Sequence, residues 1–157
     1  MFARLRCAVP RYLREIGIWN VLMGAYAANG AVSEAVALFA EMQRSEGIAP
    51  DAKAFVTLLS ACSHGGDVRR AQWLWRHEMD QTQKRNARVV SAFVDCLARN
   101  GALFAAFDAI SDFEASTTNE GGQRCEEMWL ALHNGCQIHS DSLLNCVAWT
   151  DTEQNEH

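Results

Sequence analysis

The chain has 157 residues, of which 49% are hydrophobic and 21% charged, and its net charge is −5. This composition is that of one folded domain, and its acidic balance argues against a purely electrostatic grip on nucleic acid, which needs clustered lysine and arginine. Because the sequence holds no run of about 18 apolar residues, it predicts no membrane-spanning segment.

Residues 1–15 differ in composition from the rest of the chain. Four arginines lie among the first 14 positions, apolar residues lie between them, and no acidic residue precedes Glu15. This pattern is typical of a short mitochondrial or plastid transit segment, although such segments are usually rich in serine and this one has none. The alternative is a truncated upstream helix whose basic face is solvated.

Residues 16–51 are predicted to form a helical hairpin. The apolar face of the first helix, at helical spacing, consists of Ile18, Val21, Leu22, Ala25 and Tyr26. Asn29-Gly30 ends that helix. The apolar face of the second helix consists of Val32, Ala35, Val36, Phe39 and Met42. The turn Ala49-Pro50-Asp51 closes the unit.

Similar units are predicted over residues 52–86, 87–125 and 126–150. Equivalent residues recur at steps of 36 and then 35: Gly30, Gly66 and Gly101; Ala35, Ala71 and Ala106; Phe39, Trp75 and Ile110. A period of this length is the mark of a solenoid, in which each unit covers the apolar face of its neighbour. The small alanine is expected where the two helices of a unit cross.

The sequence also predicts a helix start, a polar loop, a polar tail and a turn that lacks glycine. Asp67 is a predicted N-cap, but Arg69 and Arg70 in the first turn oppose the helix dipole and weaken that helix start. Residues 115–122 are predicted to be a polar loop, and 151–157 a polar tail. In the fourth unit, Ser140 replaces the turn glycine.

The cysteines and histidines predict neither a disulfide framework nor a metal centre. Cys62 and Cys96 fall on apolar helix faces, as does Cys136, so we expect buried free thiols and a reducing compartment. His133, Cys136 and His139 follow each other at steps of three, which could indicate zinc. We expect no metal and no other cofactor, because only three ligands are local and Cys136 belongs to the apolar face.

No catalytic set is present either. The sequence lacks the paired zinc motifs of nucleobase deaminases, a glycine-rich phosphate loop and a serine nucleophile elbow. We therefore expect a protein that is not an enzyme and has no small-molecule substrate.

The repeated residues resemble pentatricopeptide repeats over roughly residues 16–150. The segments that carry this resemblance in the first unit are WNVLMGAY from Trp19, Asn29-Gly30, Glu34-Ala35, Leu38-Phe39, Glu41-Met42 and Pro50-Asp51. LLSACSHGG from Leu58 and VDCLARNG from Val94 resemble the long and short variants of the plant-type PLS subclass. Met128-Trp129 and the run from Cys136 to His139 resemble its C-terminal extension (E-like) motif. The resemblance implies an all-α fold, a right-handed α-solenoid of about four antiparallel helical hairpins.

The resemblance also implies binding of single-stranded RNA, with one base read per repeat by two or three side chains. Carried over to the first unit, the reading pair is Asn20 and Asp51, a combination that favours uracil in the family. Val56 occupies the reading position of the second unit and cannot hydrogen-bond a base. Ser91 occupies that of the third.

The resemblance also implies that basic side chains contribute to RNA binding. Lys53 and Arg88 lie near the starts of first helices, where family side chains flank the base, and His64 and Arg99 lie near the ends, where the family contacts phosphate. The implied role is recognition of a mitochondrial or plastid transcript for editing or processing by a separate or missing enzyme.

The reading pair and two pairs of neighbouring basic residues also have a purely structural interpretation. Asn20 outside a repeat would be a solvated or capping residue, and Asp51 after Pro50 is an ordinary turn and N-cap residue. Arg69-Arg70 and Lys84-Arg85 are expected to be solvated charge rather than an RNA patch.

The alternative function is a helical-repeat scaffold for protein–protein interaction. The acidic net charge, Val56 and an exposed Trp73 favour it. RNA binding is favoured if the four basic residues Lys53, His64, Arg88 and Arg99 line one groove, and the scaffold is favoured if that groove is acidic or apolar.

Overall fold

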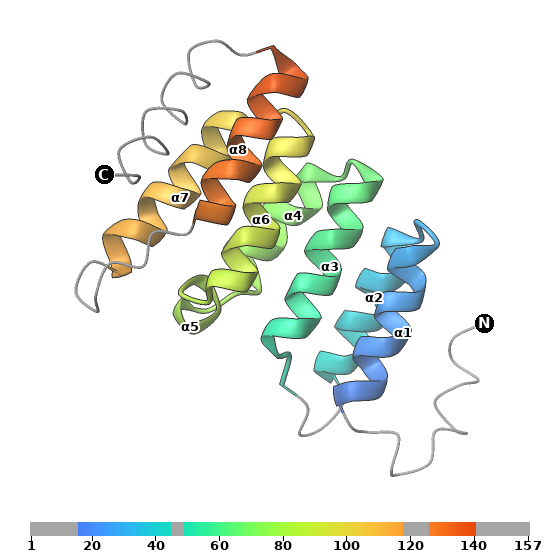
Figure 1. Ribbon diagram of the computed structural model, residues 1–157. Coiled ribbons are helices and arrows are strands. Elements are labelled where there is room, and N and C mark those ends of the chain that lie inside the picture. Colours follow the sequence, from blue (N-terminus) through green and yellow to red (C-terminus); the bar gives the residue numbers. More distant parts are fainter. Residues whose placement is uncertain (1–15, 45–48, 118–125, 141–157) are drawn as a thin grey trace.

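The computed structural model describes residues 16–44, 49–117 and 126–140 (Figure 1). Within these ranges the secondary structure is entirely helical: α1 (Ile16–Ala28), α2 (Val32–Arg44), α3 (Ala52–Gly65), α4 (Val68–His77), α5 (Gln81–Lys84), α6 (Ala87–Arg99), α7 (Leu103–Thr117) and α8 (Glu126–His139). None of these helices is long and apolar enough to cross a membrane. The predicted transit segment, the second helix of the fourth unit and the polar tail lie outside the described residues.

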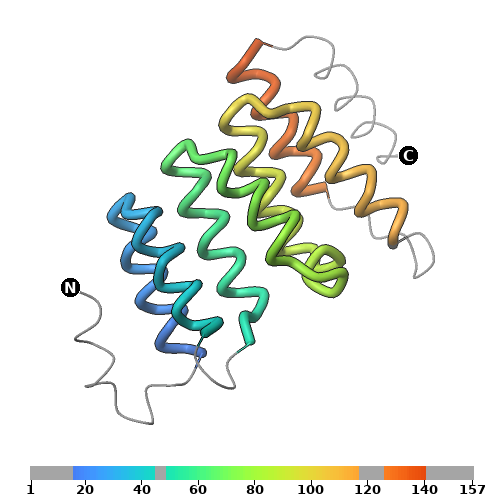
Figure 2. Tube along the Cα trace, turned by 180° about the vertical axis from the view of Figure 1, so that it is seen from behind, coloured from blue at the N-terminus to red at the C-terminus, as the bar shows by residue number. Residues whose placement is uncertain are grey.

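The helices form two layers, as the repeat period predicts. One layer consists of α1, α3, α6 and α8, each of which contacts the next. The other consists of α2, α4 and α7, which follow the first-layer helices along the chain and lie in front when the molecule is seen from behind (Figure 2). The hairpins α1–α2, α3–α4 and α6–α7 are therefore stacked side by side, and α8 opens a fourth. This is the α-solenoid that the sequence predicts.

Left-handed backbone conformations end the first-layer helices. Gly30, Gly66 and Gly101 have φ angles of 71°, 70° and 80°, and a residue without a side chain adopts this conformation at little cost. Ser140 follows α8 with a φ of 57°. It therefore occupies the position of the turn glycine, as the alignment of the fourth unit predicts.

Aspartate side chains begin α3 and α4. The carboxylate of Asp51 accepts a hydrogen bond from the backbone N–H of Ala54 at 2.8 Å, and that of Asp67 accepts from Arg70 at 3.1 Å. Arg70 also lies 3.4 Å from the Asp67 carboxylate and donates to the hydroxyl of Ser33. These contacts offset the unfavourable placement of a cation in the first turn, so the helix begins at Val68.

The core lies between the two layers. Ala35, Ala71 and Ala106, the small residues expected at the helix crossings, are all completely buried. Aromatic rings fill the space between hairpins: Trp75 stacks on Phe93 with ring centroids 4.3 Å apart. The predicted faces of α3 and α6 are also confirmed as buried: Phe55, Leu58, Leu59, Cys62, Val90, Phe93, Val94, Leu97 and Ala98.

The predicted face of α1 is wrong. Val21 and Leu22 are 67% and 45% exposed, whereas Met23 and the polar Asn20 are buried. α1 is apolar on more than one side, so its spacing alone does not identify the buried side. Contacts with α2 and α3 select the side that carries Asn20 and Met23.

Two further boundaries differ from the prediction. α7 continues to Thr117, so residues 115–117 are helical and do not belong to the polar loop expected there. The short helix α5 separates α4 from α6 and was not predicted. Asp80 begins it by accepting hydrogen bonds from the backbone of Thr82 and Gln83, and the Gln83 side chain accepts a bond from the backbone N–H of Asp80.

The cysteines of the described chain are free thiols in the core. Cys62, Cys96 and Cys136 are buried, as predicted. Burial raises the pKa of Cys62 to about 11 and that of Cys96 to about 12. Both therefore stay protonated at neutral pH and act as small apolar side chains.

Candidate nucleic-acid interface

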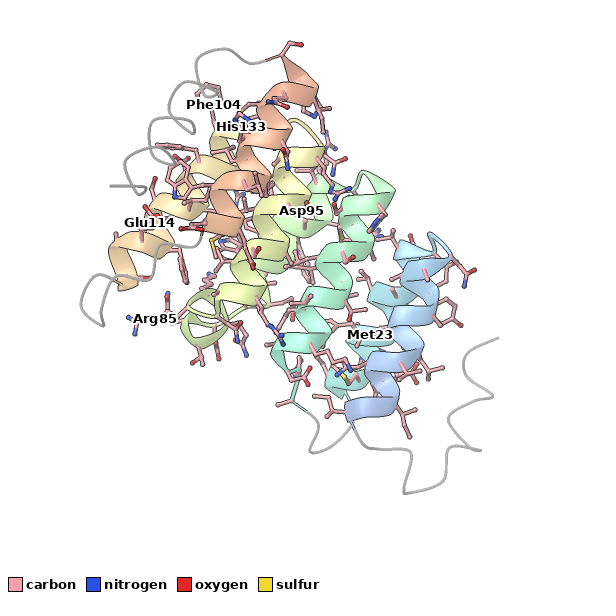
Figure 3. All side chains as sticks on the ribbon, in the orientation of Figure 1. Met23, Arg85, Asp95, Phe104, Glu114 and His133 are labelled. Carbon is pink, nitrogen blue, oxygen red and sulfur yellow. The ribbon has the colours of Figure 1, made fainter. Side chains whose placement is uncertain are left out.

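The solvent-facing side of α1, α3, α6 and α8 is one continuous surface, which we call the first-helix surface (Figure 3). Residues three to four positions apart on each helix line it. On α3 they are Lys53, Val56, Thr57, Ser60 and His64; on α6, Arg88, Ser91, Asp95 and Arg99; on α8, Glu127, Leu130, Asn134 and Ile138. All eight residues implied to contact RNA lie on α1, α3 and α6 or at their starts.

The structure brings the predicted reading pair into contact. The side-chain amide of Asn20 donates to both carboxylate oxygens of Asp51, at 3.2 and 3.3 Å. Asp51 simultaneously caps α3, so a recognition role and a structural role are compatible. Asn20 is only 4% exposed, and its carbonyl oxygen Oδ1 has no hydrogen-bond partner within the described residues. The pair therefore leaves one buried acceptor unsatisfied.

The equivalent positions of the next units are less polar. Val56 and Ser91, at steps of 36 and 35 from Asn20, are half-buried on α3 and α6. Asn86 is the residue equivalent to Asp51: it follows Asp51 by 35 positions and caps α6 by accepting from the backbone N–H of Arg88 at 3.1 Å. Sequence reasoning missed Asn86, although the repeat period alone identifies it. The second unit thus pairs an apolar residue with an amide.

The basic residues lie at the ends of α3 and α6. Lys53 and Arg88 are exposed near the two helix starts, and His64 and Arg99 are exposed near the two ends. Because α3 and α6 are neighbours in one layer, the four side chains belong to one surface, arranged as two pairs separated by about 16 Å, the length of 11 helical residues. Lys53, His64, Arg88 and Arg99 therefore lie on the two middle helices of the first-helix surface.

The cation of Arg99 already has a partner. Its Nε lies 2.8 and 3.0 Å from the two carboxylate oxygens of Asp95, to which the hydroxyl of Ser63 also donates at 3.2 Å. The hydrogen bond from Arg99 to Asp95 raises the pKa of Arg99 above its already high value. Asp95 lies one turn before Arg99 on α6 (Figure 3), so it places one negative charge beside the basic pair at the helix ends.

Exposed apolar side chains lie at both ends of the first-helix surface. Val21 on α1 is 67% exposed, and Leu130 and Ile138 on α8 are 56% and 65% exposed. Lysine and arginine side chains of this surface occur only on the central two helices, α3 and α6. Neither α1 nor α8 contains a lysine or an arginine.

The side chains of His133, Cys136 and His139 on α8 do not meet at one point. Cys136 is buried in the core, whereas a ring nitrogen of His139 lies 3.0 Å from the backbone oxygen of Arg99, and His133 lies 2.9 Å from Gln137. In the described part of the chain, no three such side chains are grouped as a metal site would require.

Comparison with known proteins identifies similar sequences. The profile of the PPR repeat family matches residues 14–64, and a PPR repeat matches residues 53–77. A putative pentatricopeptide repeat-containing protein of Arabidopsis thaliana is 33% identical over 86% of this chain and 19% of its own length. A second from the same plant is 34% identical over 82% of this chain and 24% of its own length.

A third relative, the pentatricopeptide repeat-containing protein DOT4, chloroplastic, also from Arabidopsis thaliana, is 35% identical over 82% of this chain and 14% of its own length. The chain thus spans about a fifth of the length of the curated relatives it matches.

Proposed function

Because the chain belongs to the pentatricopeptide repeat family, we propose that it binds single-stranded RNA on the first-helix surface and acts as a recognition factor in organellar RNA editing or processing. In this proposal a separate enzyme performs the chemistry, and the chain belongs to the PLS subclass with an E-like motif at α8. The compartment is a mitochondrion or a plastid; the name of one relative, chloroplastic, supports the plastid.

The observation that carries this proposal is the contact between Asn20 and Asp51. Two repeat positions 31 residues apart meet side chain to side chain, and the contact leaves an unpaired acceptor, Asn20 Oδ1. An unsatisfied buried acceptor costs about 1–3 kcal/mol. A uracil whose N3–H donates to this oxygen recovers that cost, whereas cytosine presents an acceptor at the same ring position.

Burial imposes a condition on this recognition. Asn20 is 4% exposed, so a base reaches its carbonyl oxygen only if the side chains that cover it move. The repeat therefore binds its base by a local rearrangement. We expect modest affinity, because one good base contact contributes about 1–3 kcal/mol.

The test is a filter-binding titration of the full chain against RNAs that differ at one nucleotide, preceded by selection from a random single-stranded pool. We expect the uracil RNA to bind about tenfold more tightly than the cytosine RNA, equivalent to about 1.4 kcal/mol. Asn20→Ala should abolish this difference. Equal binding of all four bases by the unaltered chain would exclude base reading at this repeat.

A scaffold function is the second candidate, favoured by the exposed apolar side chains Val21, Leu130 and Ile138 at the ends of the same surface. Leu130 and Ile138 lie about two turns apart on the same side of α8, and exposed apolar side chains that gather in this way mark protein interfaces. The same random-pool selection distinguishes the two functions. Enrichment of no RNA motif, with micromolar or tighter binding absent, would favour the scaffold.

A further inference from the structure

The opposite side of the molecule presents a second exposed surface, formed by α4 and α7, which we call the second-helix surface. α4 and α7 are successive members of the second layer and run in the same direction (Figures 1 and 2). Arg69, Trp73, Arg76 and His77 are exposed along α4. The positions 35 residues later on α7 are Phe104, Asp108, Ser111 and Asp112, of which the phenylalanine and both aspartates are exposed.

The two helices carry opposite charge and unprotected aromatic rings. Trp73 is 48% exposed and stacks on His77 with ring centroids 5.6 Å apart. Phe104 is 67% exposed at the start of α7 (Figure 3). In the described part of the chain, the ion pairs are Arg70–Asp67 and Arg99–Asp95. Among those same residues, Arg76 and Asp112 therefore have no ion-pair partner.

A twofold axis parallel to these helices and lying against this surface brings α4 of one copy onto α7 of another. Because such an axis preserves height along the helices, residues at equivalent repeat positions face each other, and the register follows from the 35-residue step. Arg69 then meets the ring of Phe104, Trp73 meets Asp108, and Arg76 with His77 meets Asp112. Each contact occurs twice, as in any isologous interface.

These pairings suit the chemistry of the side chains. An arginine over an aromatic ring, an indole N–H that donates to a carboxylate and an arginine–aspartate pair are each favourable. Tryptophan and arginine are also the residue types that contribute most to protein interfaces. From this self-complementarity we infer that the chain forms a symmetric homodimer through the second-helix surface, leaving the first-helix surface of each copy free for RNA.

An RNA strand fits this surface less well. Arg69, Arg76 and Trp73 would attract phosphate and stack a base, but they extend only about 10 Å along α4, the length of seven helical rises. Asp108 and Asp112 on the adjacent helix would repel the continuing backbone. When the partner is a second copy of the chain, the same two carboxylates pair with side chains of its α4.

Analytical ultracentrifugation of the full chain over a range of concentrations tests the inference by charge exchange. Arg76→Asp and Asp112→Arg should each raise the dimer dissociation constant at least about tenfold, since each breaks two symmetric pairs. The double variant Arg76→Asp/Asp112→Arg restores opposite charges and should recover the dimer to within about threefold. Arg44→Asp, an exposed charge reversal at the end of α2, serves as the control and should leave the dimer unchanged.

Circular dichroism of each variant establishes that it remains folded, so that loss of the dimer is not loss of structure. A monomer at every concentration tested would overturn the inference, and so would a double variant that dissociates like the single ones. Weaker RNA binding by Arg76→Asp without any change in mass would assign the surface to RNA instead. Since the dimer does not use Asn20 or Asp51, its failure leaves the proposed RNA recognition untouched.

Discussion

At the scale of single residues, Asp51 has two structural roles that one substitution removes together. Its carboxylate caps α3 and accepts the amide of Asn20. Loss of an N-cap costs about 1 kcal/mol, and an amide donor left unpaired in a buried position adds a similar amount. We therefore expect Asp51→Ala to lower the free energy of unfolding by about 2 kcal/mol, measured by urea denaturation.

Asp51→Asn is the matched control for this prediction. Asparagine caps helices as well as aspartate does, and its side-chain oxygen still accepts the Asn20 amide, so stability should stay within about 0.5 kcal/mol of the unaltered chain. An equal loss of unfolding free energy in both variants would mean that the negative charge of Asp51 itself stabilises the start of α3. The RNA titration of Asp51→Ala and Asp51→Asn distinguishes a loss of folding from a change in base preference, because only Asp51→Ala is expected to lower stability.

The sequence names candidate site residues but does not predict how exposed they are. Asn20 and Asp51 follow from the family resemblance, the structure brings their side chains into contact, and their role in base reading stays a prediction. The burial of Asn20 could not be predicted, because it depends on how α1 packs against α3, and the apolar residues of α1 surround the helix. The 35-residue step identifies Asn86 as the position equivalent to Asp51. It was missed because Val56 cannot hydrogen-bond a base, which indicated that the second unit reads no base.

At the scale of whole helices, close approach of α6 and α8 depends on a glycine. A methyl group on Gly135 would lie 2.8 Å from both the carbonyl oxygen and the Cβ of Ala98. The backbone oxygen cannot move without displacing α6. Gly135→Ala should therefore destabilise the fold by about 2 kcal/mol in thermal or urea unfolding, as overpacking typically does.

Gly24 supplies the opposite case on α1. A methyl group there would meet only Thr57, at 4.0 Å, an ordinary contact. Alanine is about 0.5–1 kcal/mol better than glycine inside a helix, so Gly24→Ala should stabilise the chain by that amount. If both variants shift stability in the same direction, then either α8 can move away from α6 at little cost or α1 gains nothing from a better helix former.

The helices themselves were largely predictable, for a physical reason that also explains the failures. In α3 and α6 the apolar side is distinct, because both helices are packed on several sides and exposed on only one, so spacing identified their buried residues. α1 lies at the edge of the described layer and has fewer neighbours, so its exposed apolar side chains misled the prediction. The short α5 contains no buried residue, and periodicity cannot detect such an element.

At the scale of the whole molecule, the charge on each surface is what decides its partner. The first-helix surface has its cations on α3 and α6 alone, whereas the second-helix surface sets basic α4 beside acidic α7. A chain of net charge −5 therefore attracts phosphate only locally. RNA affinity must come from a few contacts and not from a general positive field.

This arrangement predicts a shallow dependence of RNA binding on salt. Among the described residues, Lys53 and Arg88 are the lysine and arginine of the first-helix surface that form no ion pair, and a single strand contributes a slope of about −0.7 per phosphate neutralised. A plot of the logarithm of the RNA association constant against the logarithm of the salt concentration should therefore have a slope of about −1.4, and Lys53→Ala or Arg88→Ala should each reduce its steepness by about 0.7. Asp95→Asn should strengthen binding, because it releases Arg99 from its ion pair and removes a negative charge from the path of the strand. A slope steeper than about −4 would require cations beyond this surface, and Arg69 and Arg76 of the second-helix surface would then be the first to substitute.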